Sequence, residues 1–216
     1  MEEAFGLTIP LTLEDVCNPR EMALLVYDMQ VGIVRQVKNG PAVVARVKSV
    51  LEAAREAGVR VLFTRHLSVP LEWMGSFQYR MSMQWQHVEH PDQVNPWFLR
   101  DSPGFELVPE LAPLPSEVVL DKITMSAFEG TPLELMLRDC GIRALAIVGL
   151  AVEVGIEPTA RHAADVGIIP VILLDACGGG HEEAIQRSVA SLKFSGDALF
   201  TDEATLRRLL KRGAES

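Results

Sequence analysis

The sequence predicts a single α/β domain in which a mostly parallel sheet carries helices on both faces. Two observations lead to this prediction. Short apolar segments alternate along the chain with segments that have the 3.6-residue spacing of amphipathic helices. The short segments are continuously apolar, as expected for strands that are buried on both faces of a parallel sheet. This combination is typical of a doubly wound, three-layer sandwich of the Rossmann type.

The first elements lie before residue 65. Residues 22–27 are apolar throughout and predict a strand. A helix is predicted over residues 42–57, because apolar side chains recur near the helical period at positions 43, 44, 47, 50, 51 and 54. Gly58 ends this helix, and a second strand follows over residues 59–64.

The regular pattern resumes after residue 115. A strand over residues 118–120 precedes a helix that Thr131-Pro132 opens and Gly141 ends. The remaining elements are predicted as a strand over 144–148, a helix over 156–166, a strand over 168–175, a helix over 181–192, a short strand over 198–200 and a helix over 203–212.

Two segments lack this pattern. Residues 1–20 are polar and contain two prolines, and they predict an arm that lies across a domain formed by residues 21–216. Residues 65–115 show no periodicity and hold all three tryptophans of the chain. Long irregular segments of this kind are usually functional. We expect this one either to wall the substrate site or to form a subunit interface, where aromatic residues are enriched.

Composition limits the possible functions. The chain has 20 basic and 29 acidic residues and a net charge of −9, which disfavours nucleic acids and anionic membranes as partners. Its long apolar stretches, such as residues 168–174, are much shorter than the roughly 20 residues that span a bilayer. The N-terminus lacks the features of a signal peptide, and three widely spaced cysteines form no disulfide framework. We therefore expect a reduced, cytoplasmic protein.

Several polar residues follow the predicted strands directly. Ligands of doubly wound sheets bind beyond the carboxyl ends of the strands. The residues predicted to lie at these ends are Asp28, His66, Lys122, the loop 149–155 and Asp175. An acid, a cation and the open start of a helix together indicate a hydrolytic site.

Five segments, in order and with matching spacing, resemble the isochorismatase-like hydrolase superfamily, which includes nicotinamidases, carbamoylsarcosine amidases and isochorismatases. The resemblance covers roughly residues 20–203. The segments are Ala23-Leu-Leu-Val-Tyr-Asp-Met-Gln30, Lys122-Ile-Thr-Met-Ser-Ala-Phe128 with Thr131-Pro-Leu133, Gly141-Ile-Arg-Ala-Leu-Ala-Ile-Val-Gly149, Thr159-Ala-Arg-His-Ala163, and the strand that ends in Asp175-Ala176.

This resemblance implies roles for individual residues. In the cysteine branch of the superfamily an Asp, a Lys and a Cys form the catalytic triad. The matching Asp and Lys are Asp28 and Lys122, whereas the position of the Cys is held by Gly155. The resemblance also implies a cis peptide bond between Leu150 and Ala151. A covalent thiol intermediate at position 155 is chemically impossible without a thiol.

Isochorismatases, which this chain resembles in having glycine at that position, offer a route without a thiol. By analogy, Asp28 would act as general acid on the methylene group of an enolpyruvyl ether, and water would attack. Lys122 would hold Asp28 and the anionic substrate, and N–H groups at the start of the 156–166 helix would bind an anion. The residues expected to contact substrate are His66, Phe128, Ala151, Glu153 and Gly155.

Alternative chemistries remain open at this point. Glu153 could activate water as a general base, or it could complement the helix dipole. An amidase or ureide hydrolase could use Cys177 as a relocated nucleophile, although a free cysteine is more often a small buried hydrophobe. The chain could also be an inactive member of the superfamily that binds a small ligand.

No cofactor or metal is expected. His87 and His90 are spaced closely, but a zinc site takes three or four ligands, and no carboxylate accompanies His66 in the pattern that some nicotinamidases use. The expected partner is a small-molecule substrate. The resemblance further implies a homodimer or homotetramer.

Overall fold

The computed structural model describes residues 1–214 of the 216-residue chain. Six parallel strands form one sheet in the order β5-β4-β3-β6-β7-β8. The strands are β3 (Met22–Tyr27), β4 (Arg60–His66), β5 (Val118–Lys122), β6 (Ala144–Leu150), β7 (Ile169–Gly178) and β8 (Leu199–Thr201). All six strands were predicted from the sequence, and the doubly wound α/β class is confirmed.

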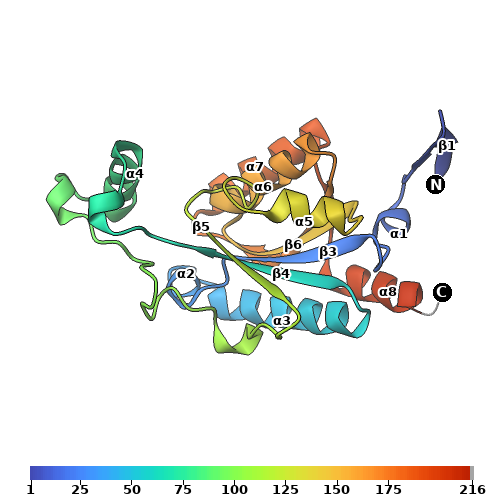
Figure 1. Cartoon of the computed structure of the whole chain (residues 1–216), viewed down its shortest axis with the longest axis horizontal. Helices are drawn as coiled ribbons and strands as arrows, with labels where there is room; N and C mark the ends of the chain where they lie inside the picture. Colours follow the sequence, from blue (N-terminus) through green and yellow to red (C-terminus); the bar gives the residue numbers. More distant parts are fainter. Residues whose placement is uncertain (215–216) are drawn as a thin grey trace.

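Helices cover both faces of this sheet (Figure 1). One face carries α3 (Gly40–Glu56) and α8 (Glu203–Ala214). The opposite face carries α5 (Leu133–Asp139), α6 (Glu157–Asp165) and α7 (Glu182–Ser195). The predicted helices all form, and their ends differ from the prediction by a few residues. At the start of α6 the difference matters, because a separate turn precedes that helix.

The central strand β3 shows how the sheet separates two cores. Successive side chains of a strand point to opposite faces. Met22, Leu24 and Val26 therefore enter the core beneath α3 and α8, whereas Ala23, Leu25 and Tyr27 enter the core beneath α5, α6 and α7. All six side chains are buried, which explains why this strand reads as continuously apolar.

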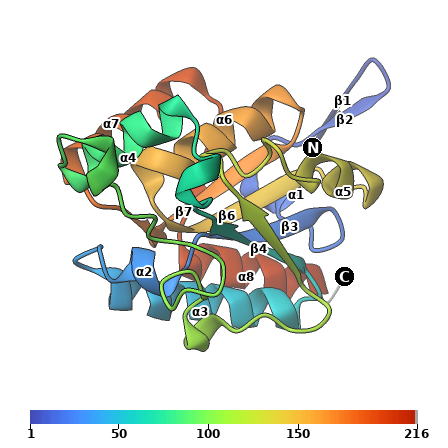
Figure 2. The same cartoon turned by 60° about the vertical axis from the view of Figure 1, so that its left-hand side comes forward.

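The N-terminal segment differs from the prediction. A hairpin of β1 (Glu2–Ala4) and β2 (Leu7–Ile9) projects from the body of the molecule and does not lie across it (Figure 2). A short helix, α1 (Leu13–Val16), follows and begins with a capping box between Thr12 and Asp15. The polar composition of this segment gave no periodicity from which either element could be predicted.

The segment 65–115 is also more regular than predicted. It contains α4 (Ser76–Gln86) and three single 3₁₀ turns, η1 (Leu71–Trp73), η2 (Pro91–Gln93) and η3 (Pro109–Leu111). No side chain of α4 is buried, and the helix contributes no residue to either core. Helix α4 stands beyond the carboxyl end of β4, apart from the two helix layers (Figure 1). A four-residue helix, α2 (Val31–Val34), follows β3.

The strand order reverses between β3 and β6. In doubly wound sheets this switch point opens a crevice at the carboxyl ends of the two strands. The strands approach closely there, because Gly149 of β6 lies opposite Tyr27 of β3. A Cβ atom on Gly149, whose φ is +121°, would lie 2.9 Å from the Tyr27 backbone nitrogen. The fold thus places the ends of these two strands side by side.

No helix within residues 1–214 is long and apolar enough to cross a lipid bilayer.

Candidate active site

A buried ion pair lies at the switch point. The Lys122 Nζ atom donates a hydrogen bond of 2.7 Å to Asp28 Oδ2. The Lys122 side chain has no exposure to solvent, and that of Asp28 is 7% exposed. Lys122 Nζ also donates to the carbonyl of Thr124 at 3.2 Å. Because both charges are removed from water, each depends on the other for compensation.

Thr64, near the end of β4, fixes the other oxygen of this carboxylate. Its hydroxyl donates to Asp28 Oδ1 at 2.7 Å and accepts the Asp28 backbone N–H at 3.2 Å. Asp28 has a φ of +48°, a left-handed conformation that is uncommon outside glycine but enriched in Asp. Strained backbone of this kind clusters at functional sites. The orientation of the carboxylate is therefore determined by two neighbouring strands.

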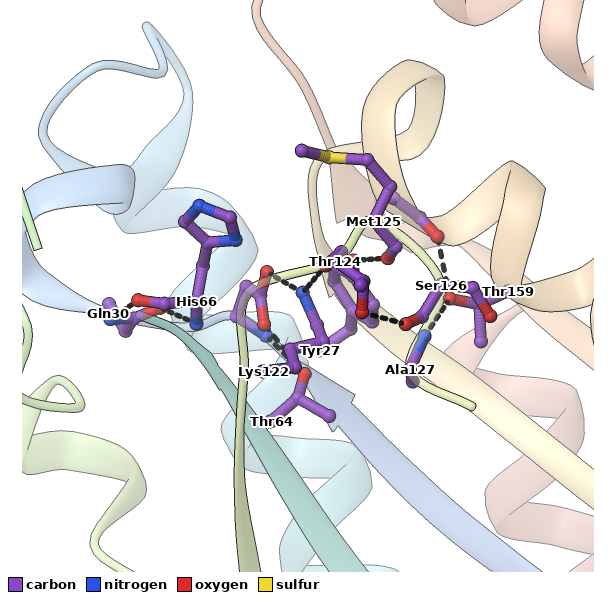
Figure 3. Close-up of polar contacts among 12 residues, drawn as sticks. Tyr27, Gln30, Thr64, His66, Lys122, Thr124, Met125, Ser126, Ala127 and Thr159 are labelled. Carbon is purple, nitrogen blue, oxygen red and sulfur yellow. Dashed lines mark hydrogen bonds and ion pairs between the residues drawn. The ribbon is translucent and has the colours of Figure 1, made fainter. Parts of the chain in front are cut away.

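His66 lies beside this pair, as predicted (Figure 3). The Gln30 side chain holds its backbone, accepting from His66 N at 2.6 Å and donating to His66 O at 3.0 Å. The imidazole packs edge-to-face against Phe98, with 6.0 Å between the ring centroids. Burial, together with the charge of Lys122, lowers the pKa of His66 to about 4, against the opposing effect of Asp28. The ring is thus neutral at pH 7.

Tyr27 lies on the other side of Lys122 (Figure 3). The Lys122 ammonium sits 4.4 Å from the centroid of the Tyr27 ring. The Tyr27 hydroxyl donates a hydrogen bond to the carbonyl of Met125, in the loop that follows β5. Burial and the Asp28 charge raise the pKa of this phenol well above its usual value, so it stays protonated. Tyr27 therefore connects the strand that carries Asp28 with the loop that follows Lys122.

The turn after β6 has the predicted cis peptide bond between Leu150 and Ala151. A π-helical turn, η4 (Val152–Ile156), leads from it into α6. The expectation that N–H groups here bind an anion needs correction. The N–H groups of Gly155 and Ile156 donate to the carbonyl of Ala151, at 3.0 and 3.1 Å, because the turn closes on itself. Ala151 is half-buried and Gly155 is buried.

Glu153 does not face Asp28, contrary to expectation. Its Oε1 atom accepts from the backbone N–H groups of Gly180 and His181, at 2.7 and 3.0 Å. The side chain thus fastens the loop before α7, where His181 is the N-cap residue. The π-helical turn directs Glu153 toward this loop, a direction that periodicity alone could not reveal.

Phe128 is engaged in packing. It is 5% exposed, belongs to the core beneath α5 to α7, and stacks on the ring of His162 with 5.1 Å between centroids. Its expected contact with substrate is therefore replaced by a packing role. The loop that holds Phe128 is also fastened to α6, because the backbone N–H of Ala127 donates a 3.0 Å hydrogen bond to the Thr159 hydroxyl.

Two further candidates lie outside the site. Cys177 is buried in β7, where burial raises the pKa of its thiol to about 12, and its sulfur donates to the carbonyl of Ile147. Asp175 points to the opposite face, where it accepts from the backbone N–H of Glu203 and lies 3.8 Å from Arg46. A buried, protonated thiol is a poor nucleophile, because only the thiolate reacts.

Within residues 1–214, no group of three His, Cys, Asp or Glu side chains is arranged to hold a metal ion.

Three of the residues that build this site were not singled out from the sequence. Thr64 directly follows the apolar run 61–63 of β4, a signal that could have indicated it. Gln30 is fully buried two residues after Asp28. Tyr27 was counted only as an apolar strand residue, and its contacts with Lys122 and Met125 depend on the packing of three elements.

Known proteins resemble this chain along most of its length. The isochorismatase domain family matches residues 22–204. The chain is 30% identical to the ureidoacrylate amidohydrolase RutB of Serratia proteamaculans over 186 residues, which cover 79% of this chain and 75% of that protein. RutB of an Enterobacter species is 29% identical over 197 residues, which cover 84% and 86%. A solved cysteine hydrolase from Pseudomonas syringae superposes with a TM-score of 0.78 and 25% identity, covering 99% of this chain and all of that one.

Proposed function

Because this chain belongs to the isochorismatase family of hydrolases, we propose that it hydrolyses a small anionic metabolite without a covalent enzyme intermediate. Asp28 is the proton-transfer residue of this reaction, Lys122 orients Asp28 and pairs with the substrate anion, and water is the nucleophile. The reaction is of the isochorismatase type and is independent of cysteine.

One observation carries this proposal, namely that the buried Asp28–Lys122 pair and Gly155, a position that offers no nucleophile, both adjoin the Tyr27 ring. Cys177, which could have served as a relocated nucleophile, is buried, and its raised pKa keeps the thiol protonated. Glu153 is engaged by the loop before α7. Water attack needs neither of them. It does need a proton-transfer group and a cation near the substrate, and Asp28 and Lys122 supply both.

The chemistry follows from the two oxygens of Asp28. A substrate carboxylate that pairs with Lys122 would release Asp28 Oδ2 to hold a proton, while Thr64 keeps Oδ1 in place. Asp28 then gives its proton to the methylene carbon of an enolpyruvyl ether. Water adds to the resulting oxocarbenium carbon, and the hemiketal breaks down to pyruvate and an alcohol.

We place the approach to the pair at His66, because the charges of Asp28 and Lys122 both act on the pKa of this ring. This ring lines a hollow of about 50 Å³ together with Trp97, Phe98 and Ile123. The hollow is far below the roughly 300–1,000 Å³ of small-molecule sites. A metabolite therefore requires the segment that carries α4 to move outward, and the neutral imidazole of His66 is then available to hydrogen-bond substrate or water.

The relatives favour a second candidate, the hydrolysis of an amide or ureide bond, because two of them are named ureidoacrylate amidohydrolases. In this chain that reaction would also use water at Asp28. The buried state of Cys177 and the contacts of Glu153 argue against a relocated nucleophile.

A substrate panel distinguishes these reactions. Isochorismate, ureidoacrylate and a set of small amides are incubated with the protein, with Asp28→Asn and with the surface control Glu134→Gln, and pyruvate and ammonia are measured. The proposal expects pyruvate from isochorismate with the wild type and the control, and none with Asp28→Asn. Ammonia alone would support the second candidate. Ligand-induced stabilisation without any product would identify an inactive, ligand-binding protein instead.

We further propose that the chain forms a homo-oligomer through the region of α4. Trp73 and Phe77 are 81% and 70% exposed, and Trp85 is 41% exposed. Exposed apolar side chains gathered on one segment mark interaction sites. Because α4 stands at the carboxyl end of the sheet (Figure 1), a second copy bound there would also lie over that end of the sheet.

A further inference from the structure

The Tyr27 ring lies directly against the backbone of Gly155, in the space where a side chain at position 155 would lie. A Cβ atom built on Gly155 would lie 2.5 Å from the Cε1 and Cζ atoms of Tyr27, and closer still to its hydroxyl oxygen. Real side chains do not approach so closely, and the Tyr27 ring is 2% exposed and cannot swing into solvent. The ring thus occupies the volume that any side chain at position 155 would need.

From this place the ring contacts both the site lysine, at the end of β5, and the loop that follows it. Its face lies 4.4 Å from the Lys122 ammonium, and its hydroxyl holds the Met125 carbonyl. Lysine has a flexible four-carbon side chain, so its ammonium is fixed only by what surrounds it. Here three groups surround it: the Asp28 carboxylate, the Thr124 carbonyl and the Tyr27 ring.

We propose that Tyr27 is a positioning residue of this site, which holds the Lys122 ammonium against Asp28, and that the absence of a side chain at Gly155 is what gives its ring room to do so. The contact is attractive because the negative face of an aromatic ring favours a cation, most strongly where water is excluded. The effect on turnover rests on the proposed function, whereas the packing between Tyr27 and Gly155 does not.

A double-mutant cycle tests the packing. The proteins compared are the wild type, Tyr27→Leu, Gly155→Ala and the double variant, with Gly75→Ala as a matched control. Gly75 has a negative φ of −75° and open space around a built Cβ atom. Gly155→Ala should lower the thermal midpoint by several degrees in the wild type and by much less in the Tyr27→Leu background, because leucine lacks the atoms that the new methyl group meets. If the two substitutions lowered the thermal midpoint additively, the inference that Tyr27 and Gly155 share one space would be wrong.

Kinetics test the positioning. On the substrate identified by the panel, Tyr27→Leu should lower kcat by about thirtyfold, the size expected for a desolvated cation–ring contact of about 2 kcal/mol. KM should change by less than about threefold, since the ring does not contact substrate. Tyr27→Phe keeps the ring and should stay nearer to the wild type. If the folded Tyr27→Leu protein kept the kcat of the wild type, the positioning role of Tyr27 would be wrong.

A spectroscopic measurement separates this inference from the proposed function. The ε-methylene protons of Lys122 lie near the face of the Tyr27 ring and should show an upfield ring-current shift in the wild type and in Tyr27→Phe, but not in Tyr27→Leu. If the wild type turned over no substrate, the proposed function would fail. The ring-current shift of Lys122 and the double-mutant cycle would still show whether the Tyr27 ring lies between Lys122 and Gly155. A Lys122 signal that is the same in all three proteins would contradict it.

Discussion

Lys122 Nζ and Asp28 Oδ2 lie 2.7 Å apart at the switch point of the sheet, and the lysine side chain has no contact with solvent. The two residues are 94 positions apart in the sequence and reach each other because β3, β4 and β5 are parallel neighbours. A buried pair of this kind adds little stability by its existence, but the loss of one partner leaves an uncompensated charge in the interior. This asymmetry leads to the first prediction.

Lys122→Met should lower the free energy of unfolding by about 3–5 kcal/mol and abolish turnover, because Asp28 is left charged and buried without its partner. Urea denaturation measures the first effect. The matched control is Arg138→Met, which breaks an exposed pair with Glu134 and should cost less than about 1 kcal/mol. Equal losses in the two variants would contradict the burial of the Asp28–Lys122 pair.

A thiol-alkylating reagent at pH 7.5 should add one group to the native protein. Cys140 is exposed, whereas burial raises the pKa of Cys17 to about 11 and that of Cys177 to about 12. Intact-mass measurement should show one adduct before unfolding and three in urea. Cys177→Ala should retain turnover. Substrate-protected alkylation of Cys177, or inactivity of a folded Cys177→Ala protein, would restore the covalent route.

His66 should make stability depend on pH. The pKa of His66 is about 4 in the folded protein and about 6.5 in the unfolded chain, so between these values the unfolded state binds more protons. Stability is therefore fully present above pH 6.5 and is lost as the pH falls toward 4, by up to about 3 kcal/mol. Urea denaturation at several pH values should show a smaller slope for His66→Gln than for the wild type.

His90 provides the control for this experiment, because it is exposed on the same segment of the chain. His90→Gln should leave the pH dependence of stability unchanged. A wild-type slope that survives in His66→Gln would show that other groups cause it.

Glu153 should prove structural when two substitutions are compared. Glu153→Gln keeps an acceptor for the N–H groups of Gly180 and His181 and should retain both fold and turnover. Glu153→Ala removes the acceptor and should cost about 1–2 kcal/mol in the free energy of unfolding. If Glu153 were the general base, Glu153→Gln would be inactive although stable, and this outcome would reject the structural role.

Phe77→Glu should weaken self-association without unfolding the monomer, since this side chain is 70% exposed and makes no contribution to either core. Light scattering after size-exclusion chromatography measures the mass of the assembly. Phe194→Glu is the matched control, because Phe194 is 94% exposed on α7, away from α4. An oligomer that Phe194→Glu disrupts and Phe77→Glu does not would place the interface elsewhere.

Residues at strand ends were the ones that could be predicted. Asp28 directly follows β3, and His66 and Lys122 are the last residues of β4 and β5. Parallel strands bring their carboxyl ends to one edge of the sheet. Residues in turns were less predictable. Glu153 and Phe128 stand close to the site in the sequence, but the π-helical turn directs one toward α7 and core packing draws the other against His162.

The sequence by itself determined the alternation of strands and helices, the buried strands and the residues that end them, because these features depend on local periodicity and apolarity. It could also show that position 155 has no side chain. Only the tertiary structure decided what fills that space, since Tyr27 and Gly155 meet through the packing of β3 against the turn after β6. Contacts between distant segments, such as that of Asp28 with Lys122 94 positions away, leave no periodic signal in the sequence, and they arrange the charges of this site.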